Sequence, residues 1–198
     1  MFTYPFILRA FVVGILISLC AALLGVPLVL KRYSMIGDGL SHVGFGALAV
    51  ASALGLAPMA VAVPVVVVAA FLLLRLSSRG KLKGDAMIAM ISTAALAVGV
   101  IALSLSNGTT GDVNNYLFGS VLAMSESDLK LSVVLAAVVL SLFAIFYRKI
   151  FSVTFDETFA RATGEKVERY NALLAFLTAI TVVLGMRVMG AMLISSLV

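Results

Sequence analysis

The sequence alternates between long apolar runs and short polar connections along its whole length. A helix needs about 20 predominantly apolar residues to cross the hydrocarbon core of a bilayer, and several runs come close to that length. The pattern predicts an all-α fold, a polytopic transmembrane helical bundle with about six full spans. The expected spans are Phe6–Leu30, Ile36–Leu56, Met59–Leu76, Ala86–Leu105, Leu129–Phe146 and Ala172–Met186.

Two further apolar stretches are too short to span. The first, Tyr116–Met124, follows a polar loop and is expected either to lie in the interface or to re-enter the membrane partway. The second begins at Val188 and reaches the last residue, Val198, so as a helix it would rise only about 16 Å. We therefore expect a single transmembrane domain over residues 1–198 with a partial seventh span, its C-terminal helices missing.

The composition agrees with a membrane protein. Apolar residues make up 63% of the 198 positions, charged residues 12%, and the mean hydropathy is +1.19. A soluble domain carries about 25% charged residues, so the lipid bilayer is the expected environment. The net charge of +5 does not indicate nucleic acid, because basic cytoplasmic loops are the usual cause in such proteins.

The basic residues lie on alternate connections and predict the orientation. The connections after the first, third and fifth runs hold eleven of the fourteen lysines and arginines. Cytoplasmic loops carry this excess, so we expect the N-terminus outside. The eleven residues are Lys31, Arg32, Arg75, Arg79, Lys81, Lys83, Arg148, Lys149, Arg161, Lys166 and Arg169.

The polar segment 148–171 is expected to contain a short amphipathic helix on the cytoplasmic side. Phe155, Phe159 and Ala162 recur at helical spacing and so share one face. Thr154 or Asp156 is expected to cap this helix, and Gly164 to end it. From the pattern alone, the segment is equally a docking site for a soluble partner and a connector resting on the membrane.

Ionisable side chains inside a membrane are costly, and the second span opens with two of them. Asp38 and His42 are four residues apart, which places them on one face of a helix, one turn apart. A carboxylate and an imidazole at this spacing can bind one borderline divalent cation such as Zn²⁺ or Mn²⁺. The alternative is an Asp–His hydrogen bond that ties helices together, and the spacing leaves both interpretations open.

Other polar positions have simpler explanations. Asp85 is expected to cap the fourth span. Asp112, in the loop before Tyr116, is either a solvated acid or a cation-attracting group at an entrance. The sequence has no Gly-x-x-x-x-Gly-Lys-Ser/Thr loop and no His-Glu-x-x-His motif, so we expect neither a nucleotide bound by a P-loop nor a zinc protease of that type.

Five ordered stretches resemble the permeases of the metal-ion ABC importers, the zinc and manganese uptake family. The first is Gly25–His42, which contains the Gly-Asp-Gly-Leu-Ser-His sequence of residues 37–42. It is followed by stretches similar to a helix entry, an outer loop, a cytoplasmic coupling segment and the start of a further helix. They lie at Asp85–Ala89, where Ala89 replaces the usual glycine, and at Asp112–Ser120, Phe155–Gly164 and Arg187–Ser196.

The resemblance implies a multi-pass permease of a bacterial-type plasma membrane. It implies pairing with a second copy, two cytoplasmic ATPase subunits that supply the energy, and an extracytoplasmic metal-binding protein. Asp38 and His42 then become the leading ligands of a transported divalent metal, with no tightly bound cofactor. Phe155, Asp156, Glu157, Phe159, Arg161 and Gly164 become the expected ATPase-coupling residues.

Two other function classes remain open at this stage. A proton-coupled secondary carrier would use Asp38 and His42 as a proton relay. A metal-dependent membrane enzyme would use the same pair, but it would need a third ligand or a base that the sequence does not place beside them.

Overall fold

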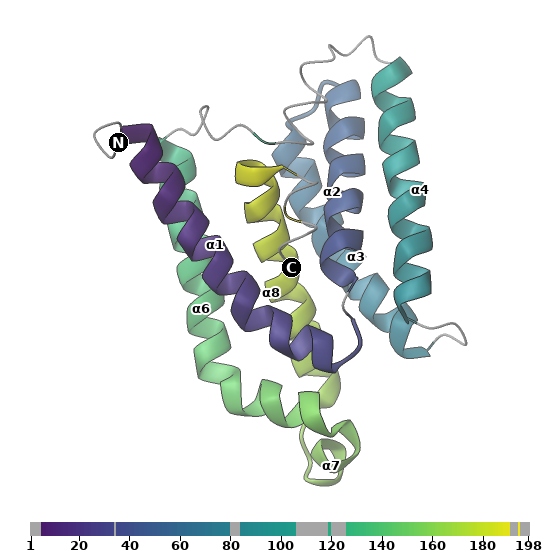
Figure 1. Ribbon diagram of the computed structural model, residues 1–198. Helices are drawn as coiled ribbons and strands as arrows, with labels where there is room; N and C mark the ends of the chain where they lie inside the picture. Colours follow the sequence, from purple (N-terminus) through teal and green to yellow (C-terminus); the bar gives the residue numbers. More distant parts are fainter. Residues whose placement is uncertain are drawn as a thin grey trace.

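The computed structural model describes residues 5–33, 35–79, 84–105, 119, 126–190 and 194, and the regular structure in these ranges is helical (Figure 1). This confirms the predicted all-α class. The helices are α1 (Pro5–Leu30), α2 (Ile36–Ala53), α3 (Pro58–Arg79), α4 (Gly84–Leu105), α6 (Glu126–Phe155), α7 (Glu157–Ala162) and α8 (Val167–Met189).

Helix α8 lies at the centre of the bundle. It packs against α3, α6, α1 and α2, with α1 and α6 on one side and α2, α3 and α4 on the other (Figure 1). Of its apolar stretch 61% is buried, against 22% for the stretches of α4 and α6. Its buried Thr178 and Thr181 donate their hydroxyls to the carbonyls of Leu174 and Leu177, so they leave no unsatisfied polar atom in the core.

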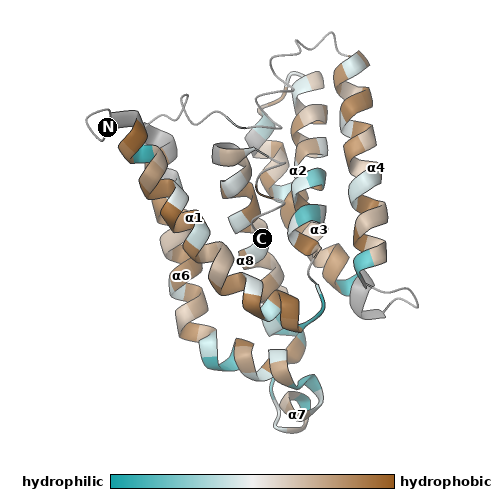
Figure 2. Cartoon of the chain, viewed as in Figure 1, coloured by the Kyte–Doolittle hydropathy of each residue, from teal (hydrophilic) through white to brown (hydrophobic). Residues whose placement is uncertain are grey.

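Four of the described helices are long and apolar enough to cross a membrane: α1, α4, α6 and α8. A fifth, α3, has a shorter apolar stretch at Ala60–Arg75. Hydropathy colouring shows apolar bodies along most helices and polar residues gathered near one end of the molecule (Figure 2). The protein is therefore a polytopic transmembrane bundle, while the expected count of six full spans stays a prediction.

The expected boundaries of the fifth and sixth spans were wrong. Helix α6 continues from Glu126 to Phe155, through residues 148–155 that we expected to lie in a loop, and α8 begins at Val167 rather than Ala172. Hydropathy falls at Arg148 and Lys149, but both residues are good helix formers, and the range 126–155 contains neither glycine nor proline. Polarity marks where a helix leaves the apolar core, and it does not mark where the helix ends.

Close helix contacts explain the glycines of α2. A Cβ at Gly46 would lie 2.6 Å from the carbonyl oxygen of Ala95 in α4, and one at Gly44 would lie 2.5 Å from Sδ of Met186 in α8. A Cβ at Gly39 would overlap Ile88 of α4. Helix α2 is therefore packed backbone to backbone against α4, and small residues permit this approach.

Three helices end in the same backbone motif, in which a residue of positive φ follows the last turn and the next amide donates to the carbonyl five residues back. Gly55 after α2 (φ +68°) and Gly164 after α7 (φ +85°) take this position, as expected for glycine. After α1 the residue is Arg32 (φ +61°), the one non-glycine residue with positive φ among the described ranges. Its amide donates to the carbonyl of Val29, and the amide of Tyr33 donates to that of Leu28, both at 2.9 Å.

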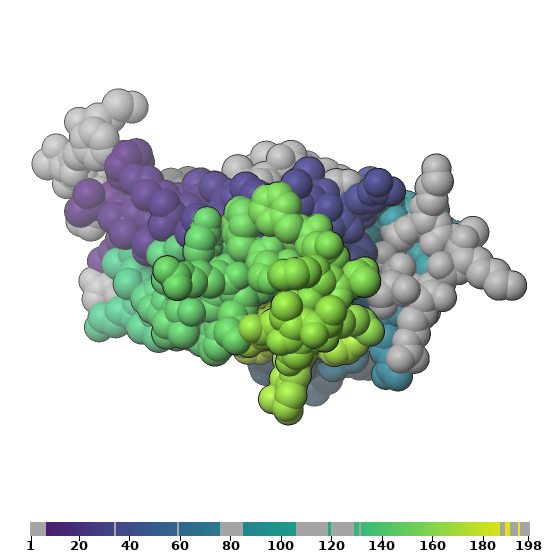
Figure 3. All heavy atoms as spheres, turned by 90° about the horizontal axis from the view of Figure 1, so that it is seen from below, coloured from purple at the N-terminus to yellow at the C-terminus, as the bar shows by residue number. Residues whose placement is uncertain are grey.

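The connections expected to be cytoplasmic meet at one end of the bundle. The C-terminal ends of α1, α3 and α6, the start of α8 and the whole of α7 lie there (Figure 1). Seen from that end, the last turns of α6 and α7 cover the middle of the face (Figure 3). We call this the basic end, because the connections that meet there carry the excess of lysine and arginine.

Candidate metal path and docking segment

Asp38 and His42 come together in the first two turns of α2. Oδ1 of Asp38 and Nε2 of His42 lie 3.3 Å apart, and the two side chains are 30% and 19% exposed. Next to them, the fully buried Ser41 donates its hydroxyl to the Asp38 carbonyl at 2.7 Å. The four-residue spacing in the sequence therefore does place both groups on one face of a helix, as expected.

The distance between the two atoms suits a shared cation. Zinc lies about 2.0–2.2 Å from carboxylate oxygen and imidazole nitrogen. With both bonds near 2.1 Å, atoms 3.3 Å apart subtend an angle of roughly 104° at the ion, which is close to tetrahedral. A direct N–H···O hydrogen bond is usually shorter, at about 2.9–3.0 Å. The separation of the two atoms is therefore compatible with a shared divalent cation.

Two ligands do not make a closed site. Within the described ranges, no group of three His, Cys, Asp or Glu side chains is placed to hold a metal. The remaining positions around an ion would be open to water, to another chain or to residues outside the described ranges. Open coordination is typical of sites that release their ion, whereas structural zinc sites are closed by four protein ligands.

The other ring nitrogen of His42 is also notable. Nδ1 is buried and has no hydrogen-bond partner within the described ranges. A ligating histidine commonly donates its second N–H to a carboxylate or a carbonyl. Here the part of the chain that the structure describes provides no such orienting group.

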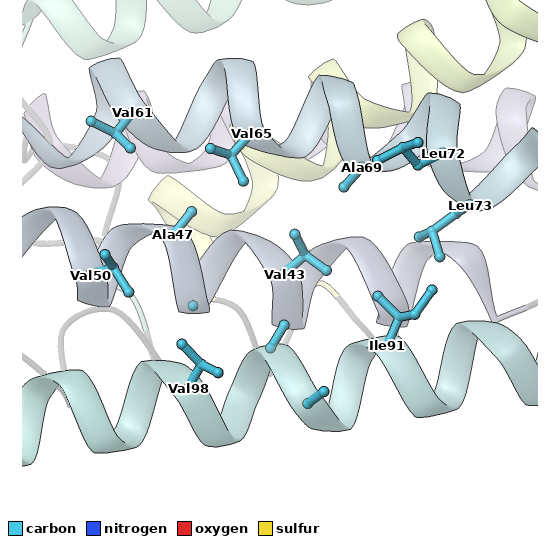
Figure 4. Close-up of a pocket in the computed structure, with 13 residues that line it drawn as sticks. Val43, Ala47, Val50, Val61, Val65, Ala69, Leu72, Leu73, Ile91 and Val98 are labelled. Carbon is cyan, nitrogen blue, oxygen red and sulfur yellow. The ribbon is translucent and has the colours of Figure 1, made fainter.

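An apolar groove of about 570 Å³ lies between α2, α3 and α4, on a different face of α2 (Figure 4). Val43, Ala47 and Val50 of α2 point into it, about 125° around the helix from Asp38 and His42 at 3.6 residues per turn. Its walls are valine, leucine, isoleucine, alanine and glycine. A groove without polar groups offers no ligand to an ion, so the Asp38–His42 face is the candidate for a metal path.

The polar segment 148–171, one expected role of which is docking of a soluble partner, contains a short, well-capped helix, α7. Oδ1 of Asp156 accepts hydrogen bonds from the amides of Thr158 and Phe159, both at 2.9 Å, so Asp156 is the N-cap of α7. Thr154, the other expected cap, instead donates its hydroxyl to the carbonyl of Ile150 within α6. Gly164 follows the helix, as predicted.

Two phenylalanines stand out from this segment. Phe155 is 68% exposed and Phe159 63% exposed, although both lie beyond the apolar body of the bundle. Phe155 is the last residue of α6 rather than part of α7, which corrects the single helix expected over residues 155–162. The opposite side of α7 is fixed by Ala160, which is fully buried in a small cluster with Val153 and Val167.

Sequence reasoning missed two residues that hold this segment in place. Lys31, at the end of α1, donates to Oε1 of Glu157 in α7 and to Oδ1 of Asn171 in α8, each at 2.6 Å. Asn171 in turn donates to Oε1 of Glu157 at 3.0 Å. In the sequence analysis, Lys31 was considered only as one of the eleven basic residues that predict the orientation in the membrane. Asn171, the polar residue directly before the apolar run that begins at Ala172, was the signal that could have pointed to this contact.

Two expected sites have other outcomes. Asp112 and the segment Tyr116–Met124 fall outside the described residues, apart from Gly119. Asp85 lies in the first turn of α4, which begins at Gly84, and so one or two positions inside the helix rather than at its N-cap. An acidic side chain there still interacts favourably with the positive end of the helix dipole.

The long apolar helices of the bundle define a polytopic membrane protein, and the comparisons with known proteins specify the class. The ABC 3 transport family matches residues 3–198. The chain therefore belongs to this family.

Named relatives match along nearly the whole chain. The manganese transport system membrane protein MntC of Halalkalibacterium halodurans is 29% identical over 97% of this chain and 66% of its own length. The high-affinity zinc uptake system membrane protein ZnuB of Haemophilus influenzae is 30% identical over 98% of this chain and 74% of its own. This chain thus spans about two thirds to three quarters of the length of these relatives.

A solved structure has the same fold. PsaBC from Streptococcus pneumoniae in complex with Fab matches with a TM-score of 0.82 and 28% identity, over 98% of this chain and 70% of the other. The alignment covers all the described helices, so the bundle is a family fold.

Proposed function

We propose that this chain is the permease subunit of an ATP-driven importer that moves divalent transition-metal ions, zinc or manganese, into the cytoplasm. The observation that carries the proposal is the Asp38–His42 pair, 3.3 Å apart and partly exposed inside an otherwise apolar helix. Ionisable groups at membrane depth mark ion pathways. The relatives named for manganese and zinc transport support the choice of cargo.

The open coordination of the pair supports passage rather than storage. An ion must bind well enough to enter the path and weakly enough to leave it. One carboxylate and one imidazole suit zinc and manganese alike, so the pair itself does not select between them.

A second copy of the chain would complete the path. In the isolated chain Asp38 and His42 are 30% and 19% exposed, and ionisable side chains facing lipid are strongly disfavoured. A second permease placed over this face would exclude lipid and provide further ligands. Alternating access would then open the path between the two copies first to an external metal-binding protein and afterwards to the cytoplasm.

The energy would come from cytoplasmic ATPase subunits bound at α7. The sequence has no phosphate-binding loop of its own. The exposed Phe159 forms an apolar knob on the capped helix α7 at the basic end, four residues after the exposed Phe155 that ends α6, and such a knob suits insertion into a groove of a soluble partner. Under the positive-inside rule this end faces the cytoplasm.

Metal uptake into vesicles tests the ligand assignment. The complete transporter is assayed with and without ATP, as wild type, Asp38→Asn and His42→Gln. We expect ATP-dependent uptake to fall at least about tenfold in both variants, which corresponds to about 1.4 kcal/mol of lost ion stabilisation. Glu168→Gln, which removes a carboxylate that is 73% exposed in α8, is the control and should transport normally.

The same assay distinguishes the competing functions. Uptake that continues without ATP but follows a proton gradient would replace the ATP-driven importer with a secondary carrier. If ATP-dependent uptake were unchanged in Asp38→Asn and His42→Gln, the path would have to lie elsewhere in the bundle.

Co-purification tests the docking site separately. Phe159→Asp places a charge on the exposed knob and should abolish recovery of the ATPase with the permease, whereas Phe159→Leu keeps the apolar surface and should retain most of it. Because Phe159 is 63% exposed, neither variant should alter the folding of the bundle. Full recovery of the ATPase with Phe159→Asp would show that α7 is only a connector.

A further inference from the structure

The end of α1, the start of α7 and the start of α8 meet in one polar cluster outside the metal path, which we call the Lys31 clasp: Lys31, Glu157 and Asn171. The Lys31 side chain is only 6% exposed, and its amine has both acceptors at 2.6 Å. A hydrogen bond of 3.0 Å from Asn171 to Glu157 joins the two acceptors to each other. Each member therefore contacts both of the others.

Burial makes the clasp stiff. A buried ammonium that loses its acceptors pays a large desolvation penalty, so Lys31 must follow Glu157 and Asn171 when they move. The other ion pairs of this region lack that constraint. Arg161 and Glu168, 2.8 Å apart, are 59% and 73% exposed, and an exposed pair contributes little.

The clasp stands beside a strained turn. Arg32, the next residue, adopts the left-handed conformation that glycine takes at the ends of α2 and α7, which costs a non-glycine residue roughly 1–2 kcal/mol. Strain of this kind persists only where the surroundings enforce it. Lys31 is anchored on one side of the turn, and Tyr33 returns to the carbonyl of Leu28 on the other.

This turn leads directly into the metal path. Only residues 31–35 separate α1 from α2, and Asp38 lies in the first turn of α2. The amide of Ile36 donates to the carbonyl of Tyr33, and that of Gly39 to Met35, so the connection has little slack. At the other end, Glu157 is two residues from the exposed Phe159 in α7.

We infer that Lys31 is a positioning residue that transmits movement of the ATPase-docking helix α7 to the α1–α2 turn and so to Asp38 and His42. A displacement of α7 moves Glu157, and the hydrogen bonds of the clasp move Lys31 with it. The strained turn at Arg32 then transmits this movement to the start of α2. Lys31 acts through its hydrogen bonds to Glu157 and Asn171. This inference rests on the function proposed above.

The test measures how much metal is moved for each ATP hydrolysed. The complete transporter is reconstituted in vesicles, and zinc or manganese uptake and ATP hydrolysis are followed together. In Lys31→Met the ATPase should still co-purify and hydrolyse ATP, while the transport-to-hydrolysis ratio falls about tenfold, within the usual 5- to 150-fold range of coupling between sites. Lys31→Arg keeps the charge and should restore most of the ratio.

Two further variants keep the result decisive. Lys149→Met removes an equally short ion pair, 2.6 Å to Glu165, but its lysine is 49% exposed and does not reach α1, so the ratio should stay at the wild-type value. Asn171→Ala removes one acceptor of the clasp and should lower the ratio by an intermediate factor. It also replaces Lys31→Met if that variant does not assemble.

Each outcome decides between the two proposals. A wild-type complex that moves no metal with ATP overturns the proposed function and the role of Lys31 with it. A normal wild type together with an unchanged ratio in Lys31→Met and Asn171→Ala overturns only the role of Lys31. A lower melting temperature with an unchanged ratio would make the clasp a purely structural contact and would overturn it equally.

Discussion

At the scale of single residues, the proposed metal path depends on how closely α2 approaches its neighbours. Gly46 faces the carbonyl of Ala95, an atom of the backbone that cannot swing aside as a side chain would. His42 lies on the same helix one turn earlier, so the contact that fixes α2 against α4 also fixes the position of His42.

The substitution Gly46→Ala should therefore destabilise the bundle, although alanine favours helix. Its Cβ would lie 2.6 Å from the Ala95 oxygen, and overpacking of this kind costs about 1–3 kcal/mol. We expect a lower melting temperature in detergent. Gly14→Ala in α1 is the control, since a Cβ there meets no atom within 4 Å, and it should leave the melting temperature unchanged or raise it. Equal melting temperatures for the two variants would contradict the close approach.

Glu157 gives the clasp a defined response to acid. Burial by itself raises the pKa of this carboxyl, but the hydrogen bonds from Lys31 and Asn171 outweigh it, so the pKa lies below its ordinary value of 4.5. A carboxylate whose pKa is lowered by folding stabilises the folded state above its ordinary pKa and loses that contribution as the pH falls through the folded value. The clasp is therefore intact at neutral pH.

Melting temperatures of wild type and Glu157→Gln, measured against pH, check this behaviour. The difference between them should be constant from about pH 8 to 5.5 and should shrink only below about pH 4.5. Since the Glu157 side chain is 44% exposed, solvent screens the pair and the difference should be small, below about 1 kcal/mol. A change between pH 6 and 7 would require a histidine, and would contradict the assignment to Glu157.

At the scale of elements, α7 is a helix of six residues that needs its cap. So short a helix is unstable by itself, because few of its amides are paired within it. Asp156 pairs two of these amides, and Ala160 buries the inner side against α6 and α8. The outer side of α7, which carries Phe159, therefore remains exposed and held away from the bundle.

Removing the cap should loosen α7 without unfolding the bundle. In Asp156→Ala, the loss of an N-cap carboxylate costs about 0.5–2 kcal/mol, and amide hydrogen exchange at residues 158 and 159 should speed up by up to about 30-fold. Asp156→Asn retains a capping oxygen and should exchange at nearly the wild-type rate. Exchange in α8 is the internal reference and should not change; if residues 158 and 159 also exchanged as in wild type, Asp156 would not be the cap.

Sequence alone predicted the elements better than their limits. Apolar runs located α1 and α4 to within two residues, and the i, i+4 spacing placed Asp38 beside His42. The end of α6 was missed because no breaker follows Arg148, and the clasp was missed because its members are 14 to 140 residues apart. Contacts between distant residues depend on how the helices pack, and a local sequence pattern does not predict that packing.

At the scale of the whole molecule, the connections of opposite polarity lie at opposite ends of the bundle. The turn between α2 and α3 contains the exposed Leu54 and Leu56, whereas the basic end contains α7 and the clasp. The positive-inside rule assigns the basic end to the cytoplasm.

Labelling with a membrane-impermeant maleimide tests this orientation. In a Cys20→Ser background, Leu56→Cys should react in intact cells, and Thr163→Cys, in the turn after α7, should react only after the membrane is permeabilised. Wild-type Cys20 should stay unlabelled in both conditions, because it is 1% exposed between α1 and α6. The opposite pattern would invert the orientation and move the docking helix to the outer face.

The length of α6 has a consequence for the surrounding lipid. Its 30 residues rise about 45 Å, about 15 Å more than the hydrocarbon core of a typical bilayer, and its last turns carry α7. Because this helix is unbroken, tilting that compensates for a thinner or thicker bilayer also swings its far end. Hydrophobic mismatch would thus change the position of α7 at the proposed ATPase contact. Membranes of different acyl-chain length should therefore alter the turnover of the transporter.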